Sequence, residues 1–204
     1  MLLRELRPAI VFVIALTLIT GVAYPFAITG IAGLLFPHQA EGSLIERDGK
    51  VIGSRLIGQE FTSDRYFHGR PSATTKADPA DATKTVPDPY NAGASLGSNL
   101  GPTSKPLVDR LSGDVARLKT ENPGARVPVD LVTTSGSGLD PHISPEAALF
   151  QVRRIARARD LPEASLRRLV ADNTTAPLLG IFGERFVNVL ELNLALDALV
   201  AGRN

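Results

Sequence analysis

The hydrophobic pattern of this chain changes sharply at Pro37. Residues 9–36, between Pro8 and Pro37, contain no charged side chain, whereas short apolar stretches alternate with polar ones after Pro37. A helix needs about 20 predominantly apolar residues to cross the hydrocarbon core of a bilayer. The pattern therefore predicts a single transmembrane helix over residues 9–36, followed by a separate domain.

A cleavable signal peptide is the main alternative for this run. The apolar region of a signal peptide is usually about 7–15 residues long and ends at a small-x-small cleavage site. Residues 9–36 exceed that length, and the small-x-small sequence at residues 30–32 is followed by the apolar residues 33–36. We therefore expect a retained membrane anchor.

The charges beside the run predict its orientation. Arg4 and Arg7 precede it against a single Glu5, while residues 38–46 contain Glu41 and Glu46 but no Lys or Arg. Cytoplasmic flanks of membrane helices carry the excess of Lys and Arg. The sequence thus predicts a cytoplasmic N-terminus over residues 1–8 and an extracytoplasmic domain over residues 37–204.

Small residues recur at helical spacing within the predicted anchor. Ala23, Ala27 and Gly30 would lie on one face of the helix, where small side chains let a second helix approach closely. The alternative is that Gly and Ala are simply common in membrane helices. Pro25 removes one helical hydrogen bond, so a bend is expected over residues 21–25.

The first part of the domain is predicted to contain a hairpin, a helix and a strand. Asp48-Gly49 between two short apolar stretches predicts a β-hairpin over residues 43–53. A helix should begin at Pro106 and end at residues 122–124, because apolar side chains recur at Leu107, Leu111, Val115 and Leu118. Residues 127–133 have the alternation of a strand.

The C-terminal part is predicted to be helical. Ser144 followed by Pro145 is typical of a helix start. This helix would place Leu149, Val152, Ile155 and Ala156 inward, and a solvated face of Arg153, Arg154, Arg157 and Arg159 outward. The cap-like residues 160–163 predict a second helix, and a last one is expected over residues 188–199. Together these elements predict an α+β domain.

The long segment between hairpin and helix, residues 61–103, is rich in Pro, Gly, Ser, Asp and Asn but carries aromatic residues at intervals. Tyr66, Phe67 and Tyr90 interrupt its polar sequence. Linkers rarely carry aromatic side chains in this way, so we expect an ordered loop region that binds a ligand or partner. A mobile loop with incidental aromatic residues is the alternative.

Charge and composition exclude several function classes. Outside the N-terminal segment with Arg4, Arg7 and Glu5, the chain has 20 basic and 20 acidic side chains, from totals of 22 and 21. A neutral domain argues against nucleic acid as a partner and against recruitment by anionic lipid. There is no cysteine, and the three histidines are not at ligand spacing, so no metal site is expected.

The best candidate site is the polar segment that precedes the helix at Ser144. It ends in Ser137, Gly138, Leu139, Asp140, Pro141 and His142. One interpretation is a periplasmic serine hydrolase using Ser137 and His142, but the segment lacks the glycine two residues before Ser137 that a nucleophile elbow needs. The others are a tight turn in which side chains bond backbone amides, and a loop that docks a partner or ligand. A weaker hypothesis is a cation-gathering mouth formed by Asp130 and Asp140.

The sequence lacks the motifs by which a protein binds ATP or forms an aspartyl phosphate to drive transport. It contains neither a Gly-x-x-x-x-Gly-Lys-Ser/Thr phosphate loop nor the Asp-Lys-Thr-Gly sequence of an aspartyl-phosphate pump. One membrane helix alone cannot form a conducting path. A transport role would therefore require a complex.

Several motifs occur in the order typical of one family. The chain resembles the C subunit of the bacterial Kdp potassium-transporting ATPase in Leu56-Ile57-Gly58-Gln59, Tyr66-Phe67-x-x-Arg70-Pro71-Ser72-Ala73, Tyr90-Asn91-Ala92 and residues 97–103, 128–133, 137–144 and 187–193. This resemblance implies a non-catalytic accessory subunit of a potassium uptake complex in the bacterial inner membrane. Its implied partners are a channel-like A subunit that selects potassium and a B subunit that hydrolyses ATP.

The resemblance also implies a chaperone-like effect on the ATP affinity of the pump subunit, with no cofactor of the chain's own. Leu56, Ile57, Gly58 and Gln59 are the nucleotide-associated residues that it suggests. The predicted orientation places these residues on the opposite side of the membrane from cytoplasmic ATP. An indirect effect through subunit packing is therefore expected instead of direct contact with ATP.

Overall fold

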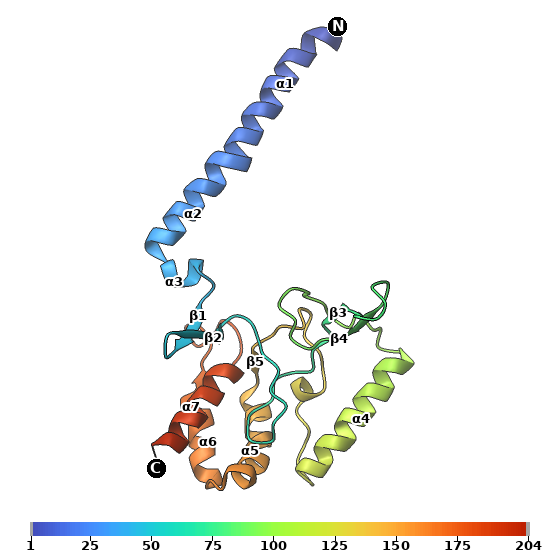
Figure 1. Cartoon of the computed structure of the whole chain (residues 1–204), viewed down its shortest axis with the longest axis vertical. Helices are drawn as coiled ribbons and strands as arrows, with labels where there is room; N and C mark the ends of the chain where they lie inside the picture. Colours follow the sequence, from blue (N-terminus) through green and yellow to red (C-terminus); the bar gives the residue numbers. More distant parts are fainter. Residues whose placement is uncertain (1, 203–204) are drawn as a thin grey trace. The chain divides into compact units, whose positions relative to one another are not determined.

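A computed structural model describes the backbone of residues 2–202 and the side chains from Arg4 to Gly202. The chain divides into two compact units, residues 1–52 and 53–204. Figure 1 shows the order of the helices and strands along the chain.

The first unit begins with the predicted apolar helix. It comprises α1 (Leu2–Leu18), a π-helical turn (Ile19–Ala23) and α2 (Tyr24–Leu35), and a short helix α3 follows (Pro37–Ala40). Over residues 4–35 the helix is long and apolar enough to cross a membrane. The π-helical turn ends two residues before Pro25, which occupies the first turn of α2, so the irregularity overlaps the residues where the bend was expected.

The predicted hairpin is confirmed. Strands β1 (Leu44–Arg47) and β2 (Lys50–Ser54) pair with each other, and Asp48 and Gly49 form the turn with φ values of 52° and 72°. Two consecutive positive φ values are what a type I′ turn requires, and Asp-Gly accommodates them readily. The sequence signal and the geometry therefore agree.

The second unit is a mixed helix and sheet fold. Its helices are α4 (Lys105–Glu121), a 3₁₀ turn (Val129–Leu131), α5 (Pro145–Arg159), α6 (Glu163–Asp172) and α7 (Val189–Ala201). Strands β3 (Thr75–Ala77) and β4 (Thr85–Pro87) pair antiparallel, and a three-stranded antiparallel sheet has the order β5 (His142–Ile143), β7 (Phe186–Asn188), β6 (Thr174–Thr175). The helices α5, α6 and α7 pack in series, as Figure 1 shows.

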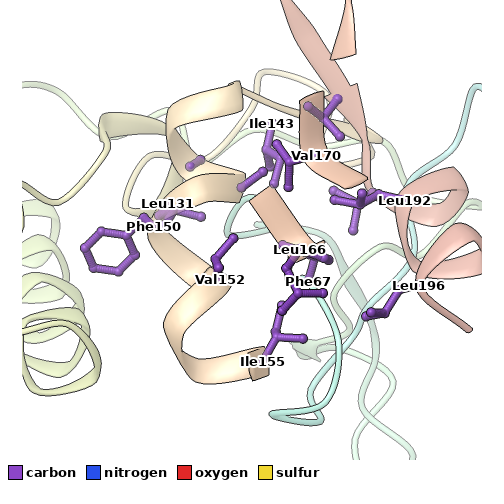
Figure 2. Packing of buried hydrophobic residues seen from close by; sticks show 14 of the residues in the cluster. Phe67, Leu131, Ile143, Phe150, Val152, Ile155, Leu166, Val170, Leu192 and Leu196 are labelled. Atoms are coloured by element: carbon purple, nitrogen blue, oxygen red, sulfur yellow. The ribbon is translucent and has the colours of Figure 1, made fainter. Parts of the chain in front are cut away.

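The hydrophobic core of this unit forms where α5, α6 and α7 meet the segment of residues 61–103, which we call the aromatic loop. Figure 2 shows Phe67 from that loop among Ile155, Leu166, Leu192 and Leu196, all fully buried. Burial of apolar surface in one cluster supplies the main favourable term in folding. The loop thus contributes directly to the core.

Two buried amide side chains hold the loop backbone in this core. Asn193 of α7 accepts a hydrogen bond from the Phe67 amide at 2.8 Å and donates one to its carbonyl oxygen at 3.0 Å. Gln151 of α5 does the same for His68, at 2.8 and 3.1 Å. These side chains satisfy backbone N–H and C=O groups that would otherwise be buried without a hydrogen-bond partner. They hold the loop backbone in place in the way that a neighbouring strand does in a sheet. The loop is thus held in place at Phe67 and His68, and its binding of a ligand or partner stays a prediction.

The strand predicted over residues 127–133 is wrong. The structure has a 3₁₀ turn over Val129–Leu131 instead. Pro128 lacks an amide hydrogen for a sheet ladder, and the carbonyl oxygen of Val129 accepts hydrogen bonds from both the amide and the hydroxyl of Thr133. Local hydrogen bonding therefore outweighs the alternating pattern of apolar residues.

The solvated arginine face predicted on α5 is wrong for two of its four members. The side chains of Arg154 and Arg159 are only 10% and 4% exposed. Arg159 pairs with Asp197 at 2.8 Å and lies 4.5 Å from the ring centre of Tyr66. Planar guanidinium groups are suited to such combined ion-pair and stacking contacts, so these arginines link α5 to α7 and to the aromatic loop.

The predicted cap at Asp160 is also wrong, although the helix after it is confirmed. Asp160 adopts a left-handed conformation with a φ of 53° and ends α5, while Pro162 precedes α6 without a capping side chain. An Asp residue tolerates this conformation at a helix C-terminus. The same short sequence therefore ends one helix instead of beginning the next.

Candidate functional site

The segment predicted as the best site is a tight turn leading into β5. The hydroxyl of Ser135 accepts a hydrogen bond from the Gly138 amide at 2.8 Å, and that of Ser137 accepts one from the Leu139 amide at 3.1 Å. Gly138 has a φ of 67°, and the carbonyl oxygen of Leu96 lies where a side chain would begin. Both serine hydroxyls thus stabilise the turn.

Asp140 joins this turn to the loop that carries Arg70. One carboxylate oxygen accepts a hydrogen bond from the His142 amide at 3.0 Å, and the other pairs with Arg70 at 3.0 Å. The Arg70 guanidinium also donates to the carbonyl oxygens of Thr133 and Thr134, at 3.3 and 3.2 Å. The interpretation as a turn whose side chains bond backbone amides is confirmed for Asp140.

The segment Leu56 to Gln59 lies against the same turn. The Gly58 amide donates to the carbonyl oxygen of Leu139 at 2.8 Å. A methyl group on Gly58 would overlap the ring of Tyr90 and lie 2.8 Å from the carbonyl oxygen of Asp140. Residues 56–59 and the turn that contains Leu139 and Asp140 are far apart in the sequence but form one packed unit. Close packing alone explains why residue 58 is a glycine.

Tyr90 connects these pieces. Its hydroxyl donates to the carbonyl oxygen of Arg70 at 2.7 Å, and its ring packs against Gly58 and Gly69. Burial raises the pKa of Tyr90 to about 12. The phenol therefore stays protonated and acts as a hydrogen-bond donor at neutral pH.

A second set of hydroxyls lies beneath Tyr90. Ser72 donates to the carbonyl oxygen of Gly138 at 2.7 Å and accepts from the Tyr90 amide at 3.0 Å. Thr74, which is 1% exposed, donates to the carbonyl oxygen of Asp88 at 2.6 Å. Sequence reasoning did not assign Arg70, Ser72, Thr74 or Tyr90 to the site, although Arg70 and Ser72 belong to the motif Arg70-Pro71-Ser72-Ala73 and Tyr90 to the motif Tyr90-Asn91-Ala92.

His142 makes its side-chain contacts with Phe186 and Asp140. Its ring contacts Phe186 with centroids 4.3 Å apart, and its Nδ1 lies 3.6 Å from Asp140. Burial lowers the pKa of His142, opposed by the charge of Asp140. Within residues 2–202, the hydroxyl of Ser137 bonds inside its own turn and makes no hydrogen bond to His142, so the arrangement gives no support to a serine hydrolase.

An open cavity of about 420 Å³ lies beside this unit. It is lined by residues from three segments, including Arg70, Asp130, Asp140, His142, Glu184 and Arg185. Asp130 accepts hydrogen bonds from the amide and hydroxyl of Ser144, at 2.7 and 3.1 Å. Both carboxylates of the hypothesised cation-gathering mouth are thus engaged in protein contacts, and the described part of the chain has no cluster of three or more metal-binding side chains.

The predicted membrane-helix face is exposed along its length. Ala23, Ala27 and Gly30 are all exposed in the described chain, and apart from the neighbouring backbone of its own helix no heavy atom lies within 4 Å of the position where a Gly30 side chain would begin. A second helix could therefore approach this face without a steric barrier. Its role in assembly stays a prediction.

Comparison with known proteins places these features in a family. The family model described as "K+-transporting ATPase, c chain" (KdpC) matches residues 6–198, which include the apolar helix and the whole packed unit around Tyr90. This chain belongs to the KdpC family. The resemblance inferred from the motifs is confirmed.

Similar KdpC proteins match along nearly their full length. A "Potassium-transporting ATPase KdpC subunit" of Methylobacterium nodulans is 69% identical over 198 residues, covering 97% of this chain and 98% of the relative. Proteins of the same name from Rhodopseudomonas palustris strain BisB18 and Bradyrhizobium diazoefficiens are each 68% identical, covering 99% and 100% of the relatives and 97% and 98% of this chain. The KdpC assignment thus covers both units.

Proposed function

We propose that this chain is a non-catalytic, single-pass accessory subunit of a potassium-transporting ATPase in the bacterial inner membrane. Residues 1–8 would lie in the cytoplasm, residues 9–36 would span the bilayer, and residues 37–204 would form an extracytoplasmic domain. Arg4 and Arg7 support this orientation, because they lie just before the start of the apolar run, whereas residues 37–46 directly after it contain no Lys or Arg. Membership of the KdpC family supports the transport role.

One observation carries the non-catalytic assignment. The polar groups that could perform chemistry are engaged in holding loops together, with Ser137 bonded to Leu139, and Asp140 to Arg70 and His142. A nucleophile must instead lie within hydrogen-bond reach of a base. The site is better suited to presenting a rigid surface to a partner than to catalysis.

The partners are proposed to be a channel-like subunit that selects potassium and a subunit that hydrolyses ATP. A chain with one membrane helix cannot conduct ions alone, so its contribution must act through contacts with such subunits. The exposed face of Ala23, Ala27 and Gly30 is suited to close contact with another helix.

Any effect on ATP affinity is proposed to be indirect, and the chain is proposed to bind no cofactor of its own. The Gly58 amide, which a phosphate would need as a donor, is already bonded to Leu139. The ring of Tyr90 covers the position next to Gly58. The proposed orientation also separates residues 56–59 from the cytoplasm.

The test is potassium-stimulated ATP hydrolysis by the purified membrane complex with and without this chain. We expect the complex that lacks it to lose most of its potassium-stimulated hydrolysis and to regain it when the chain is added back. Unchanged hydrolysis without the chain would contradict the accessory role.

A further inference from the structure

The loop between β6 and β7 presents an apolar surface that the proposed function does not use. We call residues 177–183 the apolar tip. Its large side chains are 65–80% exposed, and they are Leu178, Leu179, Ile181 and Phe182. Four adjacent large apolar side chains left in water in a folded domain indicate a surface that is covered in the working assembly.

The backbone of the apolar tip is closed on itself. The amide of Leu178 donates to the carbonyl oxygen of Phe182 at 2.9 Å, and the amide of Phe182 donates back at 3.0 Å. Leu179 has a φ of 53°, a left-handed conformation that is unfavourable for a leucine. The fold therefore holds Leu179 outward in a fixed turn, which reduces the entropy lost when a partner binds.

The composition of the apolar tip favours a protein over a lipid surface. Residues 174–183 carry no charge and no Trp or Tyr, so the tip lacks the Trp and Tyr side chains and the Lys and Arg side chains that are typical of segments at a membrane interface. Within residues 2–202, the carbonyl oxygens of Leu179, Gly180 and Ile181 accept no hydrogen bond. Irregular backbone of this kind is unfavourable in hydrocarbon, whereas a protein groove can supply donors.

The residues after the apolar tip provide a polar rim. Glu184 and Arg185 follow it directly and line the 420 Å³ cavity together with Asp140 and His142. Protein interfaces typically have an apolar centre and a polar, wet rim. A stable interface buries about 1,000 Å² or more, which is more than one loop offers, so a partner on the tip would extend over the cavity.

We propose that the apolar tip inserts into an apolar groove on another subunit of the same ATPase, with Glu184 and Arg185 at the edge of the contact. This inference rests on the proposed function, because it requires a partner subunit that is exposed on the same side of the membrane. It names residues 177–185 as the part of the domain that makes the contact.

Photo-crosslinking in the whole complex tests the inference. A photoactivatable amino acid would replace Leu179 in the full chain, and the matched control would replace Val108, which is 50% exposed on α4. After illumination of native membranes, position 179 should form an adduct with another subunit of the ATPase and position 108 should not. An adduct with lipid, an adduct with a second copy of this chain, or no adduct at position 179 would overturn it.

A substitution makes the same assay quantitative. Phe182→Ser should lower the adduct yield at position 179 about tenfold or more, because it removes a large apolar contact. Val108→Ser should leave that yield unchanged. Since Phe182 is 65% exposed, the serine does not disturb the core, and an unchanged yield would contradict the inference.

The two proposals fail separately. If the complex hydrolyses ATP normally without this chain, the accessory role is wrong, whatever the adduct at position 179. If hydrolysis depends on the chain but position 179 forms no subunit adduct, the accessory role stands and only the contact through the apolar tip is wrong.

Discussion

At the residue scale, Gly58 is the position at which a packing role and a nucleotide-binding role can be told apart. Its amide and its missing side chain are both accounted for by Leu139, Asp140 and Tyr90. The short resemblance of residues 56–59 to a nucleotide-associated motif therefore has a sufficient explanation in the fold. If Gly58 has a packing role, an added methyl group should lower the stability of the domain. If it has a nucleotide role, the methyl group should weaken ATP binding.

Gly58→Ala should destabilise the domain by about 1–3 kcal/mol, because the added methyl group overlaps the Tyr90 ring. Gly101→Ala is the matched control, since nothing lies within 4 Å of the added atom. Thermal unfolding measures both. A Gly58→Ala variant with normal stability but weakened ATP binding by the complex would instead favour a nucleotide role.

His68 gives the domain a pH dependence at the same scale. Burial, and secondly the charge of Arg154, lower the pKa of His68 below its usual value of 6.5. The unfolded chain therefore binds a proton at a higher pH than the folded chain does. Stability is fully present above pH 6.5 and is lost as the pH falls toward the lowered pKa of the folded state.

The free energy of unfolding should thus decrease as the pH is lowered from about 7 to about 5, as chemical denaturation at a series of pH values would measure. His142, whose pKa burial also lowers, adds a change of the same sign. His68→Gln should reduce the slope. A slope of opposite sign, or one unaffected by the substitution, would contradict the role of His68.

At the scale of single elements, two serines that precede helices differ in structure. Ser144 accepts a hydrogen bond from the Ala147 amide and donates to Asp130, whereas Ser104 precedes α4 without a capping bond from its side chain. Both serines lie at helix starts, so sequence position alone does not separate them. The hydrogen bonds predict that they differ in their contribution to stability.

Ser144→Ala should destabilise the domain by about 1–2 kcal/mol, because it removes the cap of α5 and one bond to Asp130. Ser104→Ala should change stability by less than about 0.5 kcal/mol. Denaturant unfolding of both variants makes the comparison. Equal effects would show that the cap at Ser144 contributes little.

The helix face in the anchor yields a further prediction at this scale. Gly30→Leu should reduce the amount of chain recovered with the purified complex by about tenfold, because a large side chain prevents close helix contact. Ala32→Leu, on the opposite side of α2, is the control. Equal recovery of the two variants would mean that the small residues of this face are present only because Gly and Ala are common in membrane helices.

The sequence predicted elements whose signals are local. The long apolar helix at the N-terminus, the Asp48-Gly49 hairpin and the helix that begins after Ser144 all follow from spacing or capping and are confirmed as elements, while the role of the first as a membrane anchor stays a prediction. The strand over residues 127–133 was predicted wrongly because Pro128 and Thr133 favour a 3₁₀ turn. Periodicity alone does not report such local hydrogen bonds.

The candidate site was predicted only in part, because its contacts are distant in sequence. Asp140 was singled out, but its partner Arg70 lies seventy residues earlier. The buried positions of Arg154 and Arg159 likewise depend on carboxylates outside their helix. No local pattern predicts which charged residues meet in the folded chain.

At the scale of the whole molecule, the account depends on the side of the membrane that the domain occupies. An extracytoplasmic domain would act on the potassium side of the complex and could affect ATP use only through other subunits. The orientation rests on Arg4 and Arg7 against the acidic residues after the anchor. The chain has no cysteine, so a single introduced cysteine is an unambiguous reporter.

The most direct measurement labels Leu56→Cys in intact cells with a thiol reagent that does not cross the membrane. Leu56 is 58% exposed and belongs to the segment suggested to associate with nucleotide, and Leu6→Cys, at a position 53% exposed, is the control for the opposite side. The account predicts that position 56 is labelled in intact cells and position 6 only after permeabilisation. Protection of position 56 with labelling of position 6 would contradict the proposed orientation and return direct contact with ATP to consideration.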